Sequence, residues 1–118
     1  DWNITIELTN DFINKFIKAK NALPESENFG IKCSNEMVEM IINYSTINTN
    51  RIKFNWKAEG STDMPVTCFS STLFKEILQA NKNFESAELN VSSAGLARVV
   101  FKLANAESTY YLVQLQTA

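Results

Sequence analysis

Few residues in this chain could carry out chemistry, because histidine is absent and only two cysteines are present. The lack of histidine excludes Ser-His-Asp and Cys-His catalysis, and it removes the commonest metal ligand. Carboxylates remain, and the closest pairs in the sequence are Glu36 with Glu39 and Glu25 with Glu27. Glu36 and Glu39 have opposite parity on one expected strand, so their side chains should leave opposite faces. We therefore predict no catalytic residue, no metal site and no enzymatic activity.

The glycines and cysteines also limit the possible functions. Gly30, Gly60 and Gly95 form neither of the glycine-rich patterns that cradle phosphates, so we predict no cofactor. Cys33 and Cys68 lie in no metal-ligand spacing, and we expect both to be reduced and buried, as suits the cytoplasm; a Cys33–Cys68 disulfide is the alternative. No segment approaches the roughly 18 consecutive apolar residues that cross a bilayer, so no membrane partner is expected.

Lysines gather in two segments with helical periodicity. Segment 9–23 carries a net charge of +2 and segment 71–83 carries +1, although the whole chain carries −2. On a helical projection, polar residues fall opposite an apolar stripe in both segments. These polar residues are Asp11, Asn14, Lys15, Lys18 and Asn21 in the first segment, and Thr72, Lys75, Glu76, Gln79 and Lys82 in the second.

Placed side by side, the two segments would form a mildly basic surface suited to loose contact with DNA phosphates. The alternative interpretation is an ordinary solvated helix face. Lys20 differs from the other lysines, because helical geometry puts it near the apolar stripe, where it can extend past the helix end.

The two segments belong to a succession of elements that occurs twice. In the first half, a strand over 2–8 precedes a helix with the stripe Phe12, Ile13, Phe16 and Ile17, and strands follow at 29–34, 37–44 and 51–57. In the second half, a strand over 65–69 precedes a helix with the stripe Leu73, Phe74, Ile77 and Leu78, and strands follow at 87–92, 96–103 and 109–116. We predict one α+β domain over 1–118, with repeats at about 1–57 and 65–118 and a connector at 58–64.

The final strand is apolar on both faces. Tyr111, Val113 and Leu115 can face the core, whereas Tyr110 and Leu112 would then make the opposite face apolar.

This pattern resembles the DNA sliding clamps, most closely the clamp of T-even-type bacteriophages. The resemblance covers nearly the whole chain, as the C-terminal half of the phage clamp subunit. Residues 4–22 look like a strand entering a channel helix, residues 66–78 look like the second such unit, and residues 110–115 resemble the tyrosine-containing closing strand of many clamps.

The resemblance implies the DNA-clamp fold, with two β-α-β-β-β repeats and two helices packed on one face of antiparallel sheets. It also implies a polymerase processivity factor that forms a homo-oligomeric ring around double-stranded DNA, binds polymerase and clamp-loader peptides, and works in the cytoplasm, or in the host cytoplasm if a phage encodes it. The DNA-facing residues would be Lys15, Lys18, Lys20, Lys75 and Lys82. The partner-peptide pocket would involve Trp2, Tyr110, Tyr111, Leu112 and Val113.

A phage-type subunit has two such domains, so the resemblance implies either a preceding domain of the same fold or a shortened relative. The alternative function is a standalone protein-interaction or small-ligand-binding α+β domain that does not encircle DNA.

Overall fold

The computed structural model describes residues 2–45 and 50–115. The first half of the chain contains β1 (Ile4–Glu7), α1 (Asn10–Ala22), β2 (Asn28–Ser34), β3 (Met37–Ile42) and β4 (Ile52–Lys57). The second half contains β5 (Met64–Ser70), α2 (Ser71–Ala80), β6 (Ser86–Ser92), β7 (Leu96–Lys102) and β8 (Glu107–Val113). The predicted order of elements is confirmed in both halves. Gln116, the predicted end of the last strand, lies outside the described residues.

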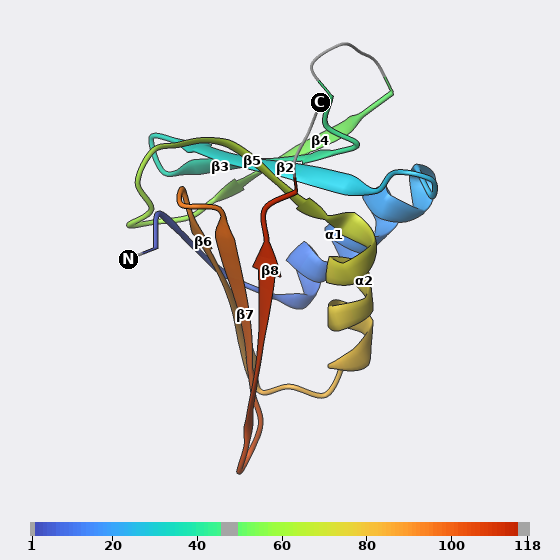
Figure 1. Cartoon of the computed structure of the whole chain (residues 1–118). Helices are drawn as coiled ribbons and strands as arrows, with labels where there is room; N and C mark the ends of the chain where they lie inside the picture. Colours follow the sequence, from blue (N-terminus) through green and yellow to red (C-terminus); the bar gives the residue numbers. More distant parts are fainter. Residues whose placement is uncertain (1, 46–49, 116–118) are drawn as a thin grey trace.

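Two antiparallel four-stranded sheets form the framework. Each sheet contains three consecutive strands from one half of the chain and one strand from the other half. Sheet A has the order β1-β6-β7-β8, and sheet B has the order β4-β3-β2-β5. The first strand of each half thus completes the sheet that the other half builds. Figure 1 shows sheet A descending from beneath sheet B, with both helices in the angle between them. This exchange, which the sequence did not reveal, binds the two halves into one unit.

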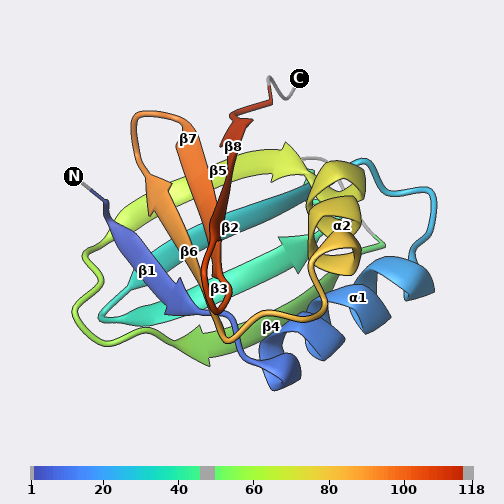
Figure 2. The same cartoon turned by 90° about the horizontal axis from the view of Figure 1, so that it is seen from below.

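Aromatic side chains join the helices to each other and to sheet B. Phe16 of α1 meets Phe74 of α2 with ring centroids 4.8 Å apart, and it also meets Phe29 of β2 at 5.4 Å. Phe12 packs edge-on against Trp56 of β4 at 5.2 Å. Figure 2 shows the two helices as neighbours at one end of the molecule. The predicted α+β architecture, with both helices on one side of the antiparallel sheets, is therefore confirmed.

Each helix begins at a hydroxyl cap that satisfies an otherwise unpaired backbone amide. Thr9 Oγ1 accepts from the Phe12 amide at 3.2 Å, and Ser70 Oγ accepts from the Leu73 amide at 3.0 Å. The predicted stripe of α2 is wrong at Leu73, whose side chain is 44% exposed. Leu73 lies in the first turn of α2, on the side away from the sheets, so only Phe74, Ile77 and Leu78 enter the core.

The predicted orientation of the closing strand is also wrong. In β8, Tyr111 is 58% exposed and Val113 is 72% exposed, whereas Leu112 is buried. The register explains this result, because Leu112 lies opposite Ala97, a buried core residue of β7. Leu115 is exposed as well. Because both parities of this strand are apolar, the sequence pattern could not decide which one enters the core.

Among the helices in the described part of the chain, none combines the length and the apolar character needed to cross a membrane.

Candidate nucleic-acid interface

The outward face of α1 carries the predicted polar set. Asp11, Asn14, Lys15, Lys18 and Asn21 are all exposed, while Phe12, Ile13 and Phe16 are buried on the other side. Neither Lys15 nor Lys18 lies within 4.0 Å of a carboxylate among the described residues. Both ammonium groups are therefore available to an anionic partner.

The outward face of α2 contributes less charge than expected. Lys75 is half-buried, and its Nζ donates to Asn21 Oδ1 of α1 at 2.5 Å, which ties the two helices together. The acceptor is a neutral amide, so this hydrogen bond does not neutralise the positive charge of Lys75 at the junction of the helices. Lys82 is exposed, but α2 ends at Ala80, so Lys82 belongs to the following loop and not to the helix.

Lys20 does not belong to this surface, which corrects the prediction that it faces DNA. Its side chain is only 5% exposed, and its Nζ donates to the carbonyl oxygen of Pro24 at 2.8 Å. The helix ends at Ala22, and the chain turns back at Leu23, which brings the Pro24 carbonyl over the last turn. Lys20 thus fixes the turn that follows α1.

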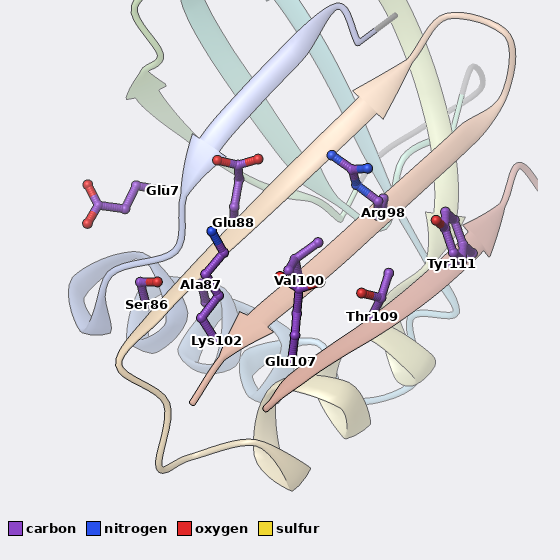
Figure 3. A pocket seen from close by; sticks show the side chains of 10 residues that line it. All are labelled: Glu7, Ser86, Ala87, Glu88, Arg98, Val100, Lys102, Glu107, Thr109 and Tyr111. Atoms are coloured by element: carbon purple, nitrogen blue, oxygen red, sulfur yellow. The ribbon is translucent and has the colours of Figure 1, made fainter. Parts of the chain in front are cut away.

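The residues predicted to bind a partner peptide divide between the two faces of sheet A. Tyr110 and Leu112 point inward, where the hydroxyl of Tyr110 accepts from Asn81 Nδ2 at 3.0 Å. Tyr111 and Val113 point outward from β8. Tyr111 of β8 and Arg98 of β7 line a shallow hollow of about 580 Å³ on the outer face of sheet A (Figure 3).

A polar cluster that the sequence analysis missed lies beside this hollow. The Trp2 ring lies 4.8 Å from the Arg98 guanidinium, and both Nε and Nη2 of Arg98 donate to Asn90 Oδ1, at 3.1 and 2.9 Å. The Asn90 amide in turn donates to Thr5 Oγ1 and Glu88 Oε2. Asn90 is 2% exposed, so its four hydrogen bonds hold Arg98 and the start of the chain in place.

Replacing Asn90 with alanine should lower the free energy of unfolding by about 1–3 kcal/mol, because buried polar partners lose their hydrogen bonds. Urea denaturation followed by circular dichroism measures this loss. Asn55→Ala serves as the control, since Asn55 is exposed on β4 and its loss should cost within about 0.5 kcal/mol. Equal losses in the two variants would show that the cluster contributes nothing to stability.

The groups considered for chemistry from the sequence are not assembled into a reactive site. Cys33 and Cys68 are free and buried, so the disulfide alternative is not realised. Burial raises the pKa of both thiols, which keeps them protonated at neutral pH and weakly nucleophilic.

The carboxylates of Glu36 and Glu39 have separate partners. Glu36 precedes β3 in a turn and accepts from the Gly60 amide, whereas Glu39 on β3 lies 3.4 Å from the Lys32 ammonium. No cluster of three or more potential metal-ligating residues occurs in the described part of the chain.

Comparisons with solved structures identify the fold. The chain superposes on the DNA polymerase III β subunit of Thermotoga maritima with a TM-score of 0.68 and 12% identity, covering 99% of this chain and 32% of that one. The β clamp of H. pylori, solved with 5-chloroisatin, gives a TM-score of 0.65 and 13% identity, with 100% and 33% of the two chains covered. The DNA polymerase III β subunit of Pseudomonas aeruginosa gives a TM-score of 0.66 and 13% identity, and the superposition covers 98% of this chain and 30% of that one.

This chain therefore has the fold of a β-clamp domain, and it spans about a third of the length of the clamp chains that it matches. No protein-family model matches the sequence, and no curated protein matches it either.

Proposed function

We propose that this chain is a non-enzymatic sliding-clamp domain that contacts duplex DNA through the outward faces of α1 and α2 and helps to tether a polymerase. The observation that carries the proposal is the direct packing of the two helices, with Phe16 on Phe74 and Lys75 bonded to Asn21. Lys15 and Lys18 lie beside Ile52 and Phe54 of β4, and Lys75 lies at the junction of the helices; in this proposal all three face the same duplex. Within the described residues, none of these three lysines has a carboxylate partner.

A few solvated lysines attract phosphates without fixing the position of the protein along the duplex. Such contacts suit a protein that must slide. Lys82, in the loop after α2, would extend the same surface. The body that bears these lysines is acidic overall, since the chain carries a net charge of −2 and has a pI near 5.1. Contact with DNA is therefore expected at a basic surface, such as the helix side, and not over the whole molecule.

The sheet edges support assembly into a ring. At the edge of β1, Asn3 and Thr5 bond to Thr62 and Ser61, and at the edge of β5 the Leu115 amide donates to the Cys68 carbonyl. The outer edges of β4 and β8 have no strand partner among the described residues. Pairing of β8 of one domain with β4 of the next would join domains head to tail, a geometry that gives a ring when the rotation between neighbouring domains closes.

Partner peptides would bind on the outer face of sheet A, where Trp2, Tyr111 and Val113 present apolar surface beside the ordered Arg98. We propose residues 1–118 as one clamp-type domain with halves at about 1–57 and 65–118. The T-even bacteriophage type, the C-terminal position in a longer subunit and the cytoplasmic site of action belong to the same proposal.

Neutralising Lys15 and Lys18 together should weaken binding to duplex DNA and reduce the slope of log K against log salt by about 2, because each phosphate contact contributes roughly 0.9 to that slope. Fluorescence anisotropy with a labelled duplex at low salt measures both quantities in Lys15→Gln/Lys18→Gln.

The matched control is Lys53→Gln/Lys57→Gln, which removes the same charge from β4 on the other side of the molecule. We expect the control to change DNA affinity little. If the control loses as much affinity as the helix variant, the helix surface is not the DNA-binding face.

A further inference from the structure

The outer face of sheet B is the second basic surface of the molecule. Lys32, Lys53 and Lys57 point outward from its strands, Arg51 directly precedes β4, and Glu39 is the one acidic residue on the same strands. These four side chains are among the 11 lysines and arginines of the chain, whose net charge is −2. We call this surface the basic sheet face. It lies on the side of sheet B opposite the helices (Figure 1).

A shallow hollow of about 450 Å³ occupies the basic sheet face, and part of its lining is apolar. Ile41, Val66, Pro65 and Tyr44 supply the apolar part. Gly30 lets Val66 and Tyr44 approach each other, because a Cβ at this position would lie 2.9 Å from Val66 Cγ2 and 3.2 Å from the Tyr44 side chain. The hollow is therefore a feature of the folded strands, with room for an apolar side chain.

The cations around the hollow exceed the carboxylate that could neutralise them. Glu39 lies 3.4 Å from the Lys32 ammonium and 4.0 Å from the Lys53 ammonium, so one carboxylate is shared by two lysines. Arg51 donates to the Ser45 carbonyl oxygen and lies 5.6 Å from the Tyr44 ring centroid. No carboxylate of the described residues lies within 4.0 Å of Arg51.

We propose that the basic sheet face binds an acidic, extended peptide segment of a partner protein, with one aliphatic side chain in the hollow and carboxylates at Lys32, Arg51 and Lys53. The proposal is independent of the DNA function, since it uses the opposite side of the molecule from the helices.

The chemistry of the hollow favours a peptide over nucleic acid. Its apolar lining is mostly aliphatic, whereas single-stranded nucleic acid is held by open aromatic faces. Its aromatic ring, Tyr44, already has the Arg51 guanidinium beside it. Glu39 lies among the cations, where its carboxylate can accept a hydrogen bond from a peptide amide.

The test uses the intact chain and a fluorescein-labelled 12-residue peptide in which Glu and Leu alternate, with a Lys-Leu peptide as the control probe. Lys53→Gln and Arg51→Gln should each weaken binding about two- to five-fold, the usual effect of one exposed charge pair. Glu39→Gln should strengthen binding by a similar factor, because it frees both lysines. Lys57→Gln, outside the hollow, should have a smaller effect than Lys53→Gln.

Three results would overturn the proposal: no binding of the acidic peptide at low salt, binding that Glu39→Gln leaves unchanged, or equal binding of the Lys-Leu peptide. Tighter binding of a single-stranded oligonucleotide that the same variants weaken would instead assign the face to nucleic acid. Lys15→Gln/Lys18→Gln should leave peptide binding intact. A failure of the DNA proposal is therefore separable from a failure of this one.

Discussion

Replacing Phe16 with alanine should lower the free energy of unfolding by about 3–5 kcal/mol, as expected for a large aromatic side chain removed from a core. Phe16 is fully buried and lies edge-on to both Phe29 and Phe74. It therefore connects α1 to sheet B and to the second helix, and its loss leaves a cavity where the three elements meet. Guanidinium denaturation followed by circular dichroism measures the change.

Leu73→Ala is the matched control for this prediction, because Leu73 is a large apolar residue on the exposed side of α2. We expect it to cost less than about 1 kcal/mol. Similar losses in Phe16→Ala and Leu73→Ala would contradict the packing that holds the two helices together.

Reversing the charge of the four helix-side lysines together, as Lys15→Glu, Lys18→Glu, Lys75→Glu and Lys82→Glu, should reduce affinity for duplex DNA by at least about 100-fold at low salt. The reason is that phosphate contacts supply nearly all of non-specific binding, and here attraction is replaced by repulsion. Electrophoretic mobility shift with a 30-base-pair duplex measures the loss.

A second quadruple variant on the basic sheet face, with Lys32, Arg51, Lys53 and Lys57 changed to Glu, imposes the same change in net charge. Its DNA affinity should fall far less, by the amount that long-range repulsion alone accounts for. Equal losses in the two quadruple variants would mean that net charge, and not the helix surface, governs DNA binding.

The elements themselves were predictable because their periodicity is local. Phe12 and Phe16 repeat at the helical period, and Ile52, Phe54 and Trp56 alternate on β4 as half-buried strand residues do. The exchange of β1 and β5 between the sheets was not predictable, since it depends on contacts between residues more than 30 positions apart, such as Ile6 with Leu89 and Phe29 with Phe69. Strand pattern alone does not specify the partner of a strand.

The candidate site was predictable only where one element decides the position of a side chain. The helical projection placed Lys15 and Lys18 correctly on the exposed face. It also put Lys20 near the apolar stripe, where the side chain is indeed buried. It could not show the partner of the Lys20 ammonium, because the Pro24 carbonyl comes from the turn after the helix. Arg98 was missed because its importance depends on Asn90 and Trp2, which belong to two other segments of the chain. The signal was a polar residue, Asn90, between the apolar residues Leu89 and Val91.

We propose that the outward faces of α1 and α2 together meet DNA. Nuclear magnetic resonance titration of the ¹⁵N-labelled chain with a short duplex locates the contact surface, because every backbone amide reports separately. We expect chemical-shift changes concentrated at Asn14, Lys15, Lys18, Asn21 and Lys75, which fade as salt is raised. Changes concentrated on the basic sheet face, or no salt-sensitive changes on either helix, would contradict it.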